Sequence, residues 1–251
     1  MTEAILNKSF ISEEEINVRY SDIDFDKKLK PFSLLNFFQD IASDNAERLG
    51  FGYSYIYPQN LMWVLLKYRI EFSEYPKDTH KLTLRTEPRG YNRFFAFRNF
   101  ELLDGHTTIA RASSTWSLVD INSLSVKNIS DVITDNEYFG KYTPQEFDLK
   151  YEKIPAITQV DYTKEFEVRY NDLDVNMHAN NGNYIVWALE PLPIEFRENH
   201  TLKNIDMMFK KEIKRSEKLI SQIQILDNTT IHALKHAETM DDLCILKCEW
   251  I

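Results

Sequence analysis

Three polar side chains that can act together on a substrate stand close together near position 175. Asp174, Asn176 and His178 alternate with apolar residues. In an extended strand, successive side chains point to opposite faces, so this carboxylate, amide and imidazole would share one side. Such groups orient a reacting carbonyl or water and move protons. The same alternation is also typical of a half-exposed strand whose polar face meets water, and the spacing alone leaves both interpretations open.

The residues that follow point to a site for negative charge. Asn180, Asn181 and Gly182 stand at the start of a helix that the hydrophobic spacing predicts over residues 181–190. The first N–H groups of a helix lack partners within it, and the helix dipole favours negative charge there. A carbonyl held at this point would develop its oxyanion against those donors. Asn180 or Asn181 can also cap the helix, and the two roles are compatible.

These residues follow the second copy of an internal repeat. Residues 18–24 read Val-Arg-Tyr-Ser-Asp-Ile-Asp, and residues 168–174 read Val-Arg-Tyr-Asn-Asp-Leu-Asp. An offset of 150 positions in a chain of 251 residues indicates two similar folding units. In the first copy, Asp26 and Lys28 replace the amide and the imidazole, and Lys30-Pro31 replaces the Asn-Asn pair. The repeat therefore predicts one reactive half and one unreactive half.

Both copies predict the same order of elements. After an extended segment, a helix begins with Ser33 as its N-cap and ends before Gly50, which suits a left-handed C-cap. Strand-like runs follow at 63–72, 81–86, 93–103 and 108–119. In the second copy an extended segment at 166–174 precedes the helix, and the strand-like runs are 205–214, 219–226, 229–235 and 243–250. Asp104-Gly105 predicts a tight turn between two strands of the first copy.

A helix followed by an antiparallel meander, repeated once, predicts an α+β fold. Each sheet would wrap its own helix, and the two sheets would join edge to edge, which hides exposed edge strands. This arrangement is a tandem double hotdog. We place the N-terminal hotdog at residues 1–140, a polar linker with Pro144 and Pro155 at 141–163, and the C-terminal hotdog at 164–251.

Composition narrows the class of protein. Thirty basic and 39 acidic side chains give a net charge of −9, which disfavours nucleic acid as a partner. The first residues do not form a basic segment followed by an apolar run, so we expect no signal or transit peptide, and no apolar run is long enough to span a bilayer. Two cysteines argue against a disulfide scaffold. We therefore expect a soluble, cytoplasmic enzyme or binding protein, either a monomer or a homodimer.

The segment of residues 174–190 resembles the signature of the acyl-acyl carrier protein (acyl-ACP) thioesterases. It reads Asp174-x-Asn176-x-His178-x-Asn180-Asn181-x-x-Tyr184-x-x-Trp187-x-Leu189-Glu190. The resemblance continues in the N-terminal half, at residues 61–64, 75–76 and 111–116. It implies a double hotdog that hydrolyses the thioester of fatty acyl-ACP and needs no cofactor or metal.

The resemblance also implies a further catalytic acid, a Glu on a strand about 34 positions after the His. Glu212 stands there; without the resemblance it is a strand charge flanked by lysines and facing solvent. Many plant members have a Cys directly after that Glu, but this chain has Ile213. Cys244 and Cys248 match no family motif, so a cysteine acyl-enzyme is disfavoured.

The resemblance implies direct hydrolysis. Glu212, helped by His178, would deprotonate a water that attacks the thioester carbon. Asn176 would position that water or the carbonyl, and Asp174 would orient its neighbours. Backbone donors at Asn180, Asn181 and Gly182 would stabilise the oxyanion. Whether Glu212 or His178 is the primary base stays open.

Two surfaces for the substrate follow from the same resemblance. A local excess of positive charge can steer the acidic acyl carrier protein towards the site, or can be a solvated strand face; its residues include Lys210, Lys211, Lys214 and Arg215. Aromatic residues on and after the first helix, from Phe37 to Tyr57, either pack the core or line an acyl tunnel.

Other functions fit the sequence less well. A hydratase on the same fold has a Pro and one more residue before its His, which this chain lacks. An acyl-CoA thioesterase and a non-catalytic acyl-binding hotdog protein are the remaining alternatives. His232 and His236 would be about 13 Å apart on one strand, too far to hold one metal ion.

Overall fold

The computed structural model describes residues 10–78, 80–134, 136–174 and 177–251. The first half contains a long helix and five strands. They are β1 (Ser12–Asn17), α1 (Pro31–Arg48), β2 (Leu61–Phe72), β3 (Lys81–Tyr91), β4 (Ala96–Asp104) and β5 (Thr107–Asp120). Short helical turns join them: η1 (Tyr20–Asp22), α2 (Tyr53–Ile56), η2 (Tyr57–Gln59) and α3 (Ile129–Val132).

The second half repeats this order of elements. It contains β6 (Tyr162–Glu167), η3 (Tyr170–Asp172), α4 (Asn181–Leu189), α5 (Ile194–Asn199), β7 (Leu202–Phe209), β8 (Lys218–Leu226), β9 (Thr229–His236) and β10 (Asp242–Trp250). A segment without strands joins the halves and runs from α3 to β6.

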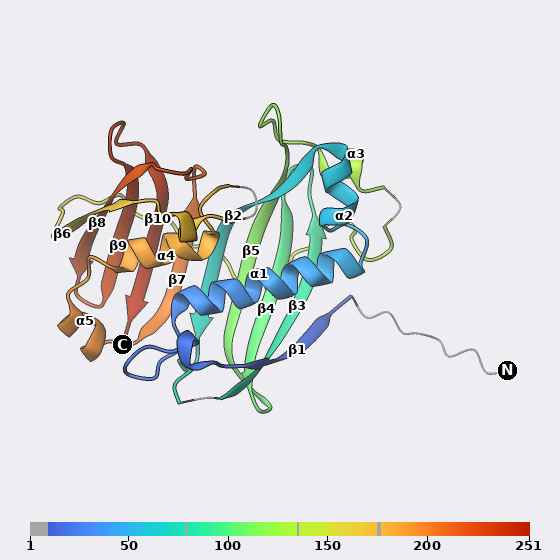
Figure 1. Ribbon diagram of the computed structural model, residues 1–251. Helices are drawn as coiled ribbons and strands as arrows, with labels where there is room; N and C mark the ends of the chain where they lie inside the picture. Colours follow the sequence, from blue (N-terminus) through green and yellow to red (C-terminus); the bar gives the residue numbers. More distant parts are fainter. Residues whose placement is uncertain (1–9, 79, 135, 175–176) are drawn as a thin grey trace.

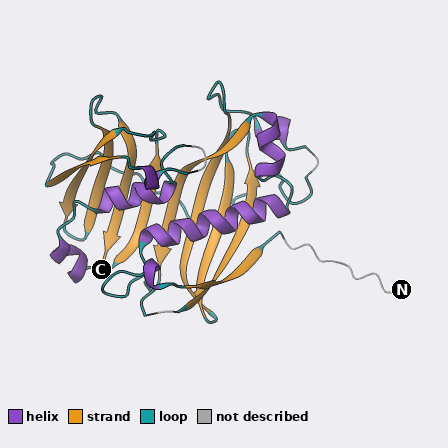
Figure 2. Cartoon of the chain, in the orientation of Figure 1, coloured by secondary structure: helices purple, strands orange, loops and turns teal. Residues whose placement is uncertain are grey.

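All strands of the described residues form one antiparallel sheet. Its order is β1-β3-β4-β5-β2-β7-β10-β9-β8-β6, so the two halves meet where β2 pairs with β7. Figures 1 and 2 show α1 and α4 on the same face of this curved sheet, each across the strands of its own half. The predicted α+β double hotdog is confirmed. Among the described residues, no helix has the length and apolar character to cross a membrane.

Several predicted boundaries are confirmed and others are wrong. Gly50 adopts φ +81° after α1, as its C-cap position predicts, and Gly105 turns the chain between β4 and β5. Ser33 is not the N-cap. Lys30 is, because Pro31 follows at the first helical position, where its missing N–H costs nothing.

The strand predicted to end at residue 214 ends at Phe209, and the extended segments of both repeats contain a 3₁₀ turn. In each turn an aspartate accepts the backbone N–H three residues before it: Asp22 from Arg19 and Asp172 from Arg169, both at 2.8 Å. This local hydrogen bond competes with strand pairing.

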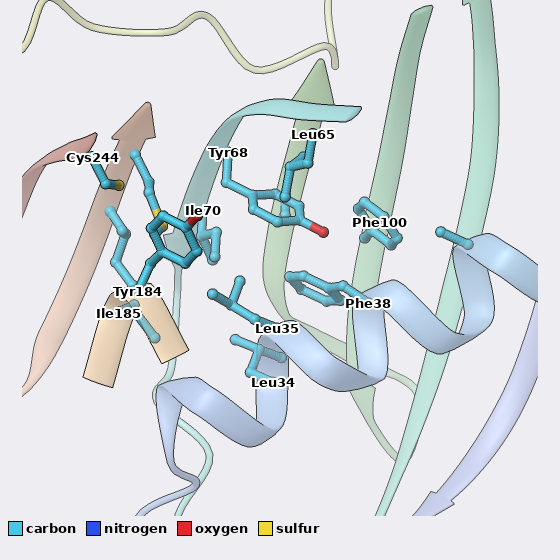
Figure 3. Close-up of a cluster of buried hydrophobic side chains, with 14 of the residues drawn as sticks. Leu34, Leu35, Phe38, Leu65, Tyr68, Ile70, Phe100, Tyr184, Ile185 and Cys244 are labelled. Atoms are coloured by element: carbon cyan, nitrogen blue, oxygen red, sulfur yellow. The ribbon is translucent and has the colours of Figure 1, made fainter. Parts of the chain in front are cut away.

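The core runs without interruption beneath both helices. Phe38 of α1 stacks on Phe100 of β4 with ring centroids 4.6 Å apart, and Tyr68 of β2 packs against both rings. Figure 3 shows these rings beside Leu34 and Leu35 of α1, with Tyr184 and Ile185 of α4 next to Leu35 on the side of the second half. The two hotdogs are therefore joined both by apolar packing and by the pairing of β2 with β7.

A buried ion pair lies at the junction of the halves. Arg69 of β2 pairs with Asp206 of β7, directly opposite it across the two strands. Glu71 also bonds Arg69 at 2.7 Å, and Asp206 accepts the Glu152 N–H at 3.1 Å. Through Glu152, the segment that connects the halves is therefore hydrogen-bonded to the Asp206 carboxylate of this ion pair.

Candidate active site

Asp174 and His178 face each other across a turn of the chain, so the prediction that these two side chains lie along one extended strand is wrong. Asp174 N–H donates to His178 O at 2.7 Å, and Met177 adopts φ +65°. The Asp174 carboxylate accepts the His178 N–H at 3.2 Å, and Leu173 pairs with Ala179. Val175 and Asn176 lie outside the described residues, so the predicted position of the Asn176 amide is not tested.

The first half contains the same turn. Asp24 N–H donates to Lys28 O at 2.9 Å, the Asp24 carboxylate accepts the Lys28 N–H at 2.9 Å, and Lys27 adopts φ +58°. Asp24 and Asp174 therefore do the same structural work in both repeats. The Asp174 carboxylate holds the turn that presents His178.

His178 and Glu212 meet at the reactive turn. The His178 Nε2 lies 3.4 Å from Glu212 Oε2, and both side chains are partly exposed. A short antiparallel contact brings them together, because Ala179 N–H donates to Ile213 O at 2.8 Å and His178 pairs with Lys214. Glu212 lies in the connection between β7 and β8, so the prediction that it stands on a strand is wrong. A carboxylate beside an imidazole suits general acid–base chemistry.

Tyr184 of α4 holds the segment around Glu212. Its hydroxyl accepts the Ile213 N–H at 3.0 Å and donates to Lys211 O at 3.3 Å, so the two hydrogen bonds flank Glu212. Tyr184 is buried, and burial raises the pKa of its phenol, which keeps the hydroxyl protonated as a donor. The sequence shows Tyr184 only as part of the motif, because this role depends on a contact 27–29 positions away.

The polar groups at the start of α4 differ in their partners. Asn180 is the N-cap and accepts the Gly182 N–H at 2.8 Å, so that N–H serves the cap. The side chain of Asn181 has no hydrogen bond to another described residue and borders a cavity. Gly182 touches α1: a Cβ there would lie 2.8 Å from Asn36 Oδ1 and 3.0 Å from the Phe32 ring. Only glycine lets the two helices approach so closely.

A cavity of about 360 Å³ connects the reactive half to the first half. Asp174, Asn180 and Asn181 border it, and α1 is the element that contributes the largest number of the other lining residues. The wall is largely apolar and aromatic; its residues include Ala42, Ala46, Phe51, Ile56, Trp63, Phe97, Trp116 and Phe139. Its largely apolar lining suits an apolar ligand.

The predicted basic patch is partly neutralised. Lys210 pairs with Asp242 and Lys211 with Asp241, each at 2.8 Å. Lys214 and Arg215 are exposed at the turn after Glu212 and have no ion pair to another described residue. Positive charge therefore remains closest to the His178–Glu212 pair.

Other reactive side chains lie in the core. Cys244 and Cys248 are fully buried, and burial raises the pKa of both thiols, which suppresses the nucleophilic thiolate. His232 is fully buried, with Nε2 2.7 Å from Thr230 Oγ1 and Nδ1 2.7 Å from Ala188 O. Both ring nitrogens are therefore engaged in hydrogen bonds within the core and are not available to bind a metal ion.

Comparisons with known proteins agree over nearly the whole chain. The family model for the acyl-ACP thioesterase N-terminal domain matches residues 10–136, and that for the C-terminal domain matches residues 155–251. A chloroplastic acyl-acyl-carrier-protein hydrolase from Cuphea viscosissima is 27% identical over 94% of this chain and 61% of its own length. A chloroplastic oleoyl-acyl carrier protein thioesterase from Arabidopsis thaliana is 26% identical over 85% of this chain and 62% of its own. The chain thus spans about six-tenths of these relatives.

Solved structures show the same fold. An acyl-ACP thioesterase from Bacteroides thetaiotaomicron superposes with a TM-score of 0.85 at 22% identity, covering 96% of this chain and 98% of that one. A 12:0-ACP thioesterase from Umbellularia californica superposes with a TM-score of 0.84 at 18% identity, covering 96% and 97%. At these identities the structural similarity shows the double hotdog fold alone.

Proposed function

This chain belongs to the acyl-ACP thioesterase family, and on that premise we propose that it hydrolyses the thioester of fatty acyl-ACP to a free fatty acid and the carrier thiol. The observation that carries the proposal is the contact between His178 Nε2 and Glu212 Oε2 at 3.4 Å, beside the start of α4. The first half has Lys28 and Tyr75 at the corresponding positions, so it supplies no comparable pair.

Glu212 and His178 act on water in the proposed reaction. Glu212 takes a proton from a water held between the two side chains, and the water oxygen bonds to the thioester carbon. The developing oxyanion meets the amide of Asn181 and the positive end of α4. The C–S bond then breaks, and the sulfur leaves as a thiol when the proton returns to it. On the basis of the sequence motif, we propose that Asn176 positions the water or the carbonyl of the thioester.

The acyl chain occupies the cavity between the reactive turn and the first half. Asp174 and Asn181 border the cavity next to the reacting carbonyl, and α1 and β4 enclose the tail. Apolar surface removed from water contributes about 25 cal/mol per Å², so the chain itself supplies much of the binding free energy.

The proposal is tested by following thiol release from acyl-ACP and acyl-CoA of matched chain length. We expect hydrolysis of acyl-ACP, and we expect Glu212→Ala to lower kcat by about 10²-fold or more, because a positioned base contributes that much. Glu238→Ala, which removes an exposed glutamate on the β9–β10 turn, is the matched control. Loss of activity in the control alone, or near-normal turnover in Glu212→Ala, refutes the assignment.

The carrier is tested on the same substrates. Lys214 and Arg215 lie beside the turn of Glu212, where they would face an acidic carrier protein. We expect Lys214→Glu/Arg215→Glu to raise KM for acyl-ACP at low salt and to leave KM for acyl-CoA nearly unchanged. Lys203→Glu is a charge reversal elsewhere on the sheet and serves as control. Equal effects on both thioesters would favour coenzyme A as carrier, and no thiol release from either would favour a non-catalytic acyl-binding protein.

A further inference from the structure

A charged side chain lies in the wall of the apolar cavity. Residues of β4 alternate between the two faces of the sheet, and Ala96, Phe100 and Leu102 point inward. Arg98 stands in the same phase, so its side chain also points inward, and only 6% of the residue is exposed. It borders the cavity together with Ala96 and Phe97. A buried arginine in an apolar wall requires a partner.

The partners of Arg98 within the chain are neutral. Its Nη1 donates to Asn45 Oδ1 at 2.8 Å and to Thr86 Oγ1 at 3.0 Å. Across the described ranges, no carboxylate forms an ion pair with it, and neither Nε nor Nη2 has an acceptor. The carboxylates that border the cavity are engaged elsewhere: Glu47 accepts the Ser54 N–H, and Asp174 accepts the His178 N–H. Arg98 therefore has donors to spare.

Asn45 holds the guanidinium in place. It is fully buried, and its Nδ2 donates to Phe10 O at 3.0 Å and to Ser12 Oγ at 2.9 Å. These bonds fix the orientation of its amide, so Oδ1 is directed at Arg98. Burial lowers the pKa of Arg98 to about 9, which still leaves it charged at neutral pH. The chain thus positions a permanent cation beside the cavity.

Two buried polar atoms of the first half have no hydrogen bond in the described structure. One is Oε1 of Gln39, a residue of α1 that borders the cavity; the other is the hydroxyl of Tyr68, which is 1% exposed and packs against Phe100 of β4. Figure 3 shows the Tyr68 hydroxyl directed into the space between Phe38 and Phe100, away from the reactive half. Buried polar atoms are satisfied in most native proteins, so the unused donors of Arg98 and these two unpaired oxygens favour a polar partner that the chain itself does not supply.

The position of Arg98 along the cavity fixes which part of a substrate meets it. Phe32 and Asn36 of α1 touch Gly182 at the reactive end, and Asn45 lies about eleven residues from the midpoint of that contact. At about 1.5 Å of rise per helical residue, Arg98 lies roughly 16 Å from the start of α4. An extended chain covers that distance in about a dozen bonds.

We propose that Arg98, supported by Asn45 and Thr86, binds an oxygen near the far end of the acyl chain, so that the protein prefers acyl groups with a distal hydroxyl or carboxylate over unsubstituted ones. The proposal rests on the proposed function for the identity of the reacting end. An unsubstituted tail at this depth removes water from a charged group and gives nothing back, which costs free energy. An oxygen acceptor restores a charge-assisted hydrogen bond at the same place.

The experiment compares three ACP thioesters: dodecanoyl, ω-hydroxydodecanoyl and ω-carboxyundecanoyl. We expect kcat/KM for at least one oxygenated thioester to exceed that for dodecanoyl by roughly tenfold or more, since a hydrogen bond to a charged group supplies that discrimination. The separate hydroxyl and carboxylate arms identify which oxygen is preferred. If dodecanoyl is hydrolysed as well as both oxygenated chains, the proposal is wrong.

Variants attribute the preference to Arg98. We expect Arg98→Met to abolish the preference and to improve the relative rate on dodecanoyl, while Arg98→Lys, which retains the charge without the fork, keeps part of it. Arg98→Met removes the buried charge but leaves the buried Asn45 Oδ1 without its donor, which lowers the unfolding free energy, so the denaturant midpoint of each variant is measured as well. Arg85→Met, at a partly exposed position of β3, is the control. An unchanged preference in Arg98→Met refutes the proposal, and the wild-type comparison decides it alone if that variant does not fold.

Binding of the free acids separates this proposal from the proposed function. Calorimetric Kd values for dodecanoic, ω-hydroxydodecanoic and dodecanedioic acids should show the same order of preference, and the same loss in Arg98→Met. If no thioester is hydrolysed, the proposed function fails and these Kd values still test the site at Arg98. If turnover occurs but all three acids and all three thioesters are treated alike, the site at Arg98 fails and the hydrolase assignment stands.

Discussion

Replacing Tyr184 by Phe removes one oxygen atom and tests how the protein holds its base. That oxygen accepts the Ile213 N–H at 3.0 Å and donates to Lys211 O at 3.3 Å. The ring itself, which packs against Phe209 and Trp187, would stay in place. The substitution therefore frees the backbone on both sides of Glu212 without removing apolar contacts.

The expected magnitudes follow from these two bonds. Ile213 is fully buried, so its N–H loses its acceptor in a place that water does not reach, and this costs about 1–3 kcal/mol of unfolding free energy. Lys211 is exposed, so its carbonyl can bond water instead and adds little. A shift of about 1 Å in Glu212 would lower kcat by up to about 10²-fold, because the base must meet its proton in register.

The assay measures kcat, KM and the denaturant midpoint for Tyr184→Phe and for a matched variant. Tyr151→Phe also removes a tyrosine hydroxyl, from a partly buried side chain of the connecting segment that bonds Thr115 of β5 at 3.0 Å. We expect both variants to lose stability, but only Tyr184→Phe to lose kcat at a temperature where both are folded, with KM nearly unchanged. Equal kcat in the two variants would show that Tyr184 serves stability alone and would refute the positioning role.

Three further outcomes follow from the structure. Gly182→Ala should lower the unfolding free energy by about 1 kcal/mol despite the better helix propensity of alanine, because its Cβ meets Asn36 and Phe32; thermal unfolding measures this. Burial lowers the pKa of His232 to about 4, below the usual value near 6.5 in the unfolded chain. Between these two pH values the unfolded state binds a proton that the folded state does not. The free energy of unfolding should therefore fall as the pH drops from about 6.5 to about 4, by up to about 1.4 kcal/mol per pH unit. Denaturant titrations at pH 7 and pH 5 measure this fall in unfolding free energy, and it should be smaller in His232→Gln than in the wild type. Asp206→Asn should cost about 3 kcal/mol in the same titration, whereas the double change Arg69→Met/Asp206→Leu should cost much less, since an apolar pair leaves no unmatched charge.

The regular elements are largely predictable because their signals are local. Hydrophobic alternation marks β8 and β9 to within a residue at each end, and Gly50 marks the end of α1. The turn at Asp174 defeats the same reasoning. Its residues alternate as a strand does, but a carboxylate–backbone hydrogen bond and the left-handed Met177 outweigh that pattern.

The site depends more strongly on contacts between distant residues. The family resemblance places Glu212 near His178, but neither periodicity nor charge would do so, since the contact is made by pairing of Ile213 with Ala179. The role of Tyr184 is invisible for the same reason. Arg98 left one local signal, a charged residue in the inward phase of β4, whose meaning appears only once α1 and the cavity are in place.

The charges that join β2 to β7 have a consequence for how such a protein arose. Lys77 pairs with Lys28 in the first half, and Lys214 pairs with His178 in the second, so Lys77 and Lys214 are equivalent positions 137 residues apart. The same offset makes Arg69 equivalent to Asp206. These two residues therefore lie on the pseudo-twofold axis that relates the halves, where each faces its own counterpart. In a dimer of identical subunits that place holds the same residue twice, and two like charges there repel. Joining the halves in one chain lifts this restriction, and the opposite charges let each half select its counterpart over a copy of itself.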